Sequence, residues 1–155
     1  MFLFEDNYGK SNRIIKTRIT VSTEAVILAN KICRDALQCV STRQALSERL
    51  LDELCDGAKI DIVKLKISDT KQYHRRANGR VAMKQYGSYR PASKHISIQN
   101  LTAVRGQILA PKTFLDTLLH EWMHHYDTYK LKLRSIHSKG FYQRINDLKE
   151  KLELK

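Results

Sequence analysis

Apolar positions in the first third of the chain recur at the three- and four-residue spacing of helices. One helix is predicted over about residues 23–39, with an apolar face made of Ala25, Leu28, Ala29, Ile32 and Ala36. A second is predicted to begin with Ser41 as its N-cap, because Gln44 follows three residues later in a capping-box pattern, and to end near Gly57. The pattern therefore predicts a helical part over about residues 1–57.

The middle of the chain changes to the two-residue alternation that is typical of strands. Residues 59–67 alternate in this way, with a phase change at Ile62 and Val63 that indicates a bulge. The polar stretch 69–79 is predicted to be a loop. Residues 80–87 and 93–99 predict two further short strands, joined through the turn-like segment GSYRPAS at 87–93.

Helical spacing returns in the last third. Pro111 suits the first turn of a long helix. The apolar stripe of this helix contains Phe114, Leu115, Leu118, Leu119, Trp122 and Met123. A last amphipathic helix is predicted after Ser138, with Phe141, Ile145, Leu148 and Leu152 on one face. The order of elements predicts an α+β fold, and 155 residues suffice for one domain over 1–155, with the sheet and the functional part at about 58–155.

Composition adds limits to this picture. After MFLF the chain turns acidic, which is too early for a signal peptide, and no apolar run approaches the length of a membrane span. We therefore expect a soluble, cytoplasmic protein without a membrane partner. The cysteines Cys33, Cys39 and Cys55 have no CxxC spacing and are predicted to be small buried side chains. Any metal must then be held by histidine and carboxylate.

Charge is distributed unevenly. Lys and Arg number 28 against 16 Asp and Glu, a net charge of +12, and residues 70–115 contain no acidic residue. Such a one-sign region favours a polyanionic partner, nucleic acid above all, although a solubilising surface would have the same composition. Aromatic residues lie among the cations in KQYHRR and KQYGSYR, as they do in single-strand binders, but an exposed edge strand would look the same. The candidate nucleic-acid contacts are Lys71, Arg75, Arg76, Arg80, Lys84, Arg90 and Lys94.

The long helix carries HEWMH, which matches the pattern H-E-x-x-H. His120 and His124 lie one turn apart on the same helical face, so their imidazoles can converge on one Zn²⁺. Glu121 lies about 100° around the helix from His120, where it can act as general base on a zinc-bound water. Two solvated surface histidines beside an ordinary glutamate are the alternative interpretation.

A catalytic zinc site commonly has three protein ligands and one open position. His125 points away from His120 and is not expected to share the metal. Asp127 lies on the motif face and is predicted to support a ligand imidazole more often than to be a ligand. Glu150 is a conceivable ligand in a charged tail. His137, thirteen residues past His124, could be brought back under the motif by a hairpin-like return of the chain.

Other candidates are weaker. Tyr126, Tyr129 and Tyr142 are near enough in sequence to stabilise an oxyanion, but tyrosines at helical spacing usually pack. His74 and His95 are predicted to be surface or sheet residues.

The segment TFLDTLLHEWMHHYD followed by HSKGFYQRI resembles the SprT-like (Spartan-type) zinc metalloproteases. That family has HExxH on a helix and a third histidine in an HG-x-x-F-like segment that opens the next helix. SKHISIQNL is similar to the family's strand before the motif helix, and GSYRP to the glycine-containing stretch before that strand. The resemblance covers about residues 80–151. It implies a zincin-like fold.

Carried over by position, the resemblance implies that His120, His124 and His137 hold one Zn²⁺ and that Glu121 is catalytic. Two features depart from the family pattern: Ser138 stands where the glycine after the third histidine is usual, with Gly140 two residues on, and no cysteine zinc ribbon follows.

We therefore expect a zinc metallopeptidase that hydrolyses peptide bonds of a protein or peptide substrate, including DNA-associated proteins, with DNA as a further partner. The alternative is a DNA-binding or antirestriction-type module in which zinc is structural and proteolysis is absent or vestigial.

Overall fold

A computed structural model describes residues 5–35, 39–71, 73–77, 80–85 and 87–154, and for 73–77 and 80–85 it describes the course of the backbone only. Ten elements follow one another along these residues. The helices are α1 (Asn7–Arg13), α2 (Thr23–Cys33), α3 (Val40–Ala58), α4 (Pro111–Tyr129) and α5 (Lys139–Lys151). The strands are β1 (Lys64–Lys71), β2 (Tyr73–Ala77), β3 (Arg80–Gln85), β4 (Gly87–Arg90) and β5 (His95–Leu101). The predicted α+β class is confirmed.

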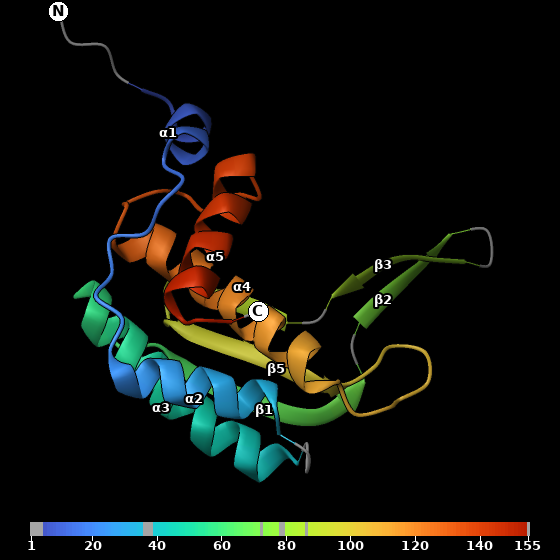
Figure 1. Ribbon diagram of the computed structural model, residues 1–155. Coiled ribbons are helices and arrows are strands. Elements are labelled where there is room, and N and C mark those ends of the chain that lie inside the picture. Colours follow the sequence, from blue (N-terminus) through green and yellow to red (C-terminus); the bar gives the residue numbers. More distant parts are fainter. Residues whose placement is uncertain (1–4, 36–38, 72, 78–79, 86, 155) are drawn as a thin grey trace, which may run out of the picture.

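The strands form a three-stranded sheet and a separate hairpin. In the sheet the order is β1-β5-β4, with β1 parallel and β4 antiparallel to β5, and β2 pairs with β3 in the hairpin. Figure 1 shows this hairpin projecting away from the helices. The strand β4 is thus an edge of the sheet.

The long helix α4 lies in the centre of the fold. It contacts β4 and β5 on one side and α5 on another, and α2 and α3 also pack against it (Figure 1). Its predicted apolar stripe is confirmed, since every member is at most 2 % exposed: Phe114, Leu115, Leu118, Leu119, Trp122 and Met123. The helix also begins at Pro111, as predicted, so the core fixes α4 rigidly under the sheet.

The first two predicted helices are displaced. The helix predicted over 23–39 ends at Cys33, and residues 36–38 lie outside the described residues. The next helix has Cys39 as its N-cap, and Ser41 lies inside it, so the capping-box prediction is wrong. The reason is tertiary: the Gln44 side chain donates to the Leu65 carbonyl at 2.8 Å and accepts from the Ile67 amide at 3.0 Å. Its amide group therefore pairs with strand β1 and not with its own helix end.

The strand boundaries also differ from the prediction. Strand β1 begins at Lys64, so the phase change at Ile62 and Val63 precedes the strand, and Lys59 ends α3 in the left-handed conformation. The loop predicted over 69–79 is wrong, because β1 continues to Lys71 and residues 73–77 pair as β2 with β3. Residues 87–90 of the predicted turn are strand β4, paired with β5. The helix α1 was not predicted.

No helix among the described residues has the length and apolarity needed to cross a membrane. The three cysteines are free thiols, and the prediction that all are buried holds only for Cys55. Cys33 and Cys39 are half-buried; Cys39 occupies the N-cap position of α3, and its thiol lies beside the hydroxyls of Ser41 and Thr42.

Candidate metal centre

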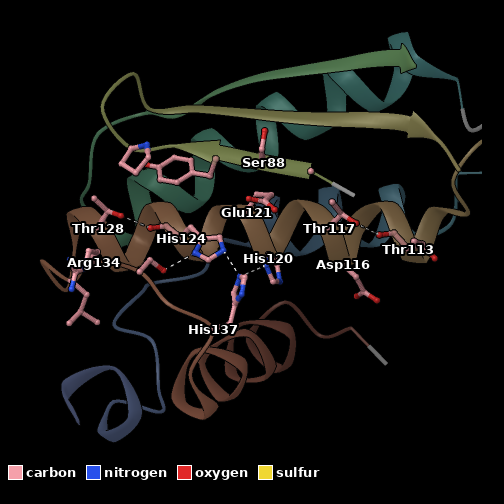
Figure 2. A pocket seen from close by; sticks show the side chains of 15 residues that line it. Ser88, Thr113, Asp116, Thr117, His120, Glu121, His124, Thr128, Arg134 and His137 are labelled. Atoms are coloured by element: carbon pink, nitrogen blue, oxygen red, sulfur yellow. Dashed lines mark hydrogen bonds between the residues drawn. The ribbon is translucent and has the colours of Figure 1, made fainter. Parts of the chain in front are cut away.

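Three imidazoles from two separate parts of the chain meet at one point. His120 and His124 project from the same face of α4, with ring centroids 5.0 Å apart. The loop before α5 brings His137 to them, so that its Nε2 lies 3.2 Å from Nε2 of His120 and 3.0 Å from Nε2 of His124. Figure 2 shows the three rings pointing toward one another. They are the group among the described residues whose ligand atoms lie close enough to hold a metal ion.

The spacing and the protonation of these rings fit a zinc site. Two nitrogens bound tetrahedrally to one Zn²⁺ at 2.0–2.1 Å lie about 3.3 Å apart, close to the 3.0 and 3.2 Å observed. Burial, together with the neighbouring histidines, lowers the pKa of His120 to about 4 and that of His124 to about 3. Both rings are therefore neutral at pH 7, as imidazole ligands must be.

The tautomer of His124 is set by the hydrogen bond that its Nδ1 makes. The Ser135 hydroxyl donates to Oδ2 of Asp127 at 2.9 Å, so it accepts from Nδ1–H of His124 at 2.8 Å. Nε2 of His124 then carries the lone pair that faces the other two rings. Asp127, predicted to support one of the motif imidazoles, reaches His124 only through Ser135, a residue that the sequence reasoning missed.

Phe141 lies beneath the cluster. Its ring is stacked on His124 at 4.7 Å and meets the rings of His120 and His137 at 5.1 and 5.4 Å. It is completely buried, so it closes the lower side of the site to water. Phe141 was predicted as an apolar helix position, and its role under the imidazoles follows from how the chain returns to α4.

The exposed His137 is carried by a loop that the N-terminal segment holds in place. The Asn7 side chain donates to the carbonyl of Arg134 at 2.8 Å and accepts from its amide at 2.9 Å. Lys10 donates to the Leu131 carbonyl at 2.7 Å, and the hydroxyls of Ser11 and Ser138 bond at 2.7 Å. Because these contacts run along the loop, helix α1 fixes the position of the third imidazole.

Two departures from the expected motif have local reasons. Ser138, where a glycine is usual, is the N-cap of α5, and its hydroxyl accepts from the Phe141 amide at 3.1 Å. Gly140 lies against α1, and a Cβ there would be 2.0 Å from the Ser11 carbonyl oxygen. A glycine is therefore required where the two helices meet.

Glu121 lies on the β4 side of the histidines (Figure 2) and is 7 % exposed. Burial raises the pKa of its carboxyl group to about 7 in the metal-free protein. A Cβ added at Gly87 would approach its Cγ to 3.3 Å, which shows how closely β4 covers this side chain. A buried carboxyl group with this pKa can accept or release a proton near neutral pH.

The histidines and Glu121 open into a cleft of about 980 Å³ between β4 and the loop before α5. Figure 2 shows its extent, from Thr113 and Asp116 at one end to Thr128 and Arg134 at the other. Ser88 and Tyr89 of β4 form the opposite wall. The cleft is large enough to enclose a ligand of several residues, which suits a binding site for an extended chain.

His125 points away from the three rings, as predicted. Its Nε2–H donates to the Asp61 carbonyl at 2.7 Å, so its Nδ1 accepts from the Tyr89 hydroxyl at 2.6 Å. The Tyr129 hydroxyl donates to the Pro91 carbonyl at 2.6 Å. These contacts tie the end of α4 to β4 and its turn, and so fix the width of the cleft.

Of the other predicted candidates, Tyr126 is buried, and its hydroxyl accepts from the Arg18 amide at 2.8 Å. Tyr142 is 48 % exposed, with its ring 6.2 and 6.1 Å from the rings of His120 and His137. Glu150 is exposed on α5 and does not join the metal-binding group.

The predicted nucleic-acid contacts have different outcomes. The side chains of Arg75, Arg76, Arg80 and Lys84, and of His74, lie outside the described residues. Lys71 and Arg90 are exposed at the ends of β1 and β4. Lys94 pairs with Asp61 at 2.6 Å and lies over the Tyr129 ring, so its charge is partly used within the protein.

Comparisons of the chain with protein-family models, curated proteins and solved structures gave no match.

Proposed function

We propose that this protein is a zinc-dependent metallopeptidase of the SprT-like, zincin type. The observation that carries the proposal is that Nε2 of His137 lies 3.2 and 3.0 Å from Nε2 of His120 and His124, in a cleft that Glu121 also lines. His120, His124 and His137 would hold the ion, and the donor set of three neutral imidazoles suits Zn²⁺.

A zinc ion held there would act as a Lewis acid on a carbonyl group and would lower the pKa of a bound water. The protein's own contribution is the proton transfer. The carboxylate of Glu121 takes a proton from the attacking water and passes it to the nitrogen of the leaving amine. Its burial supports this role, because desolvation raises the pKa of the carboxyl group and so makes its carboxylate a stronger base toward the water proton.

A peptide suits this cleft better than a compact ligand. β4 is the edge strand of the sheet and lines the cleft above Glu121, so an extended peptide can lie along it as an added strand. One side of the histidine cluster faces this space, which is the arrangement of a catalytic zinc site and not of a closed structural one.

DNA-associated proteins are the proposed substrate class. The support is the acid-free stretch of residues 70–115, in which the exposed Lys71 and Arg90 stand at the ends of two strands of the sheet. A cationic surface near the cleft would concentrate the enzyme on DNA, and the contact would weaken as salt is raised.

The test is cleavage by zinc-loaded protein of a basic DNA-binding protein, with and without single-stranded DNA. We expect fragments that a chelator abolishes and that Glu121→Gln does not produce, although this variant keeps its zinc. Salt-dependent DNA binding with stoichiometric zinc and no cleavage under any condition would favour the alternative, a DNA-binding or antirestriction-type module. Protein without stoichiometric metal would refute both.

A further inference from the structure

One end of the cleft carries an arginine side chain that forms no ion pair among the described residues. Arg134 lines the cleft beyond His124 and is exposed (Figure 2). At the other end, the carboxylate of Asp116 is paired with Lys149 at 2.7 Å. The two ends therefore present different charges to a ligand: Arg134 is available, and Asp116 is largely compensated.

The surroundings of Arg134 reinforce its charge. Residues 128–146 contain no Asp or Glu, and they include Lys130, Lys132 and Lys139 besides Arg134. The further arginine of this stretch, Arg144, is buried and paired with Asp127, so it does not act on the cleft. A carboxylate that enters this end meets positive charge without a competing acid from the loop.

The backbone of Arg134 is held firmly even though its side chain is exposed. Both its amide and its carbonyl bond the Asn7 side chain, at 2.9 and 2.8 Å. Lys10 anchors the same loop at Leu131. A guanidinium that projects from a fixed backbone loses less conformational freedom when it binds a ligand.

The direction of β4 indicates which part of a bound peptide would lie at the Arg134 end of the cleft. Gly87, its first residue, lies against Thr117 and Glu121, and Pro91, just after its end, is bonded by Tyr129. The strand therefore runs in the same direction as α4. A peptide that pairs antiparallel with β4 begins at the Arg134 end and continues past Glu121 toward Thr117.

We propose that Arg134 forms a subsite for an acidic side chain, Asp or Glu, on the amino-terminal side of the bond that is cleaved. This inference rests on the proposed peptidase function. The guanidinium fork matches a carboxylate in two parallel hydrogen bonds. The site is partly exposed, so its contribution falls as salt screens it.

The first experiment profiles cleavage of a random peptide library by mass spectrometry. For the wild type we expect Asp and Glu to be enriched about two- to fivefold at one position before the scissile bond, the range given by partly exposed ion pairs. Arg134→Gln should abolish the enrichment, Arg134→Lys should keep part of it, and Arg134→Glu should replace it with Lys and Arg. Lys132→Asn is the matched control, since it removes a charge from the same loop outside the cleft lining and suits the positive φ of 57° at this position.

The second experiment reads binding without cleavage. Two fluorescein-labelled peptide pools that differ only in Glu or Gln at one fixed position are titrated into Glu121→Gln protein and followed by fluorescence anisotropy. The subsite predicts that the Glu pool binds more tightly, that adding Arg134→Glu reverses this preference and that salt weakens it. This result supports the subsite even if no peptide is cleaved. In that case only the peptidase proposal fails. Cleavage with a profile that Arg134→Glu leaves unchanged, or an acidic preference only after the scissile bond, overturns the subsite and leaves the peptidase intact.

Discussion

Asp127 and Arg144 form a two-pronged ion pair in the interior of the protein. Nε and Nη2 of the arginine donate to Oδ1 and Oδ2 of the aspartate at 3.0 and 2.8 Å, and both side chains are 0 % exposed. The same arginine donates through Nη1 to the carbonyls of Ser11 and Ile14, both at 2.6 Å. One side chain of α5 thus joins the motif helix to the N-terminal segment.

Removing one partner of this pair should destabilise the protein strongly. Arg144→Met and Asp127→Asn should each lower the free energy of unfolding by about 3–5 kcal/mol, because each leaves a buried charged group without its partner. Urea unfolding of the metal-free proteins measures the loss. In the double variant the total loss of unfolding free energy should be clearly smaller than the sum of the two single-variant losses. Additive losses would show that the two residues do not interact.

Ser135→Ala should weaken zinc binding and leave the fold intact. The serine orients the His124 ring, and loss of such a contact typically costs 10–100-fold in metal affinity. Competition with a chromogenic chelator measures the change, with the exposed turn variant Ser93→Ala as control. Equal affinities of the two variants would contradict the role of Ser135.

Glu121→Gln should abolish the proposed peptidase activity and stabilise the metal-free protein at high pH. The folded pKa of about 7 lies above the usual value of 4.5, so the stabilising effect of this carboxyl group is present below pH 4.5 and is lost as the pH rises through 7. A neutral amide avoids burying a charge. We therefore expect the metal-free variant to melt higher than the wild type at pH 8 and to differ little at pH 4.5. A variant that is less stable at pH 8 would contradict this explanation.

The metal-free Glu121→Gln protein should also show the titration of the two motif histidines. Their folded pKa values, about 4 and 3, lie below the usual 6.5, so stability is full above pH 6.5 and is lost as the pH falls toward 4. Each histidine contributes a slope of up to about 1.4 kcal/mol per pH unit. Unfolding free energies from pH 7 to 4.5 measure it, and replacing His120 and His124 by Asn should flatten the curve. If the unfolding free energy of the Asn variant fell with pH as steeply as before, groups other than these two histidines would cause the pH dependence.

Gly140→Ala should separate α1 from the rest of the site. The added methyl group would lie within 3 Å of the Ser11 and Asn12 backbone, so the helix must move away. We expect faster hydrogen exchange of the α1 amides and weaker zinc binding, because the loop that bears His137 loses its support. Gly9→Ala is a control on α1 itself, where the closest contact is the Asp6 side chain. Unchanged exchange in Gly140→Ala would mean that α1 does not depend on this contact.

The motif helix could be predicted from the sequence because its signals are local. Pro111 and the apolar stripe determine α4, and the four-residue spacing alone places His120 and His124 on one face. The position of His137 required the chain to fold back, which the sequence permits without specifying. His137 was the candidate that remained after His125, Asp127 and Glu150 had been weighed, and the resemblance to the SprT-like family implied the same residue.

What the sequence could not predict depends on side chains bonded across long separations. Ser135 and Asn7 are ordinary polar residues in their local context, and their roles come from partners 11 and 127 positions away. Gln44 was misassigned for the same reason, since it has the right spacing for a cap but bonds β1. β4 is only four residues long. Its sequence contains Gly87 and is followed by Pro91, which is typical of a turn, and only the pairing with β5 makes it a strand.

The contacts of Arg144 with the segment that ends at Ile14 have a consequence during synthesis. A ribosome completes the HEWMH segment before it has made the arginine that joins this segment to α1. A nascent chain that stops short of Arg144 can already contain all three histidines, but it lacks the side chain that joins Asp127 of α4 to the Ser11 and Ile14 carbonyls. This contact between the motif helix and the N-terminal segment can therefore form only after α5 has been synthesised and has packed against both.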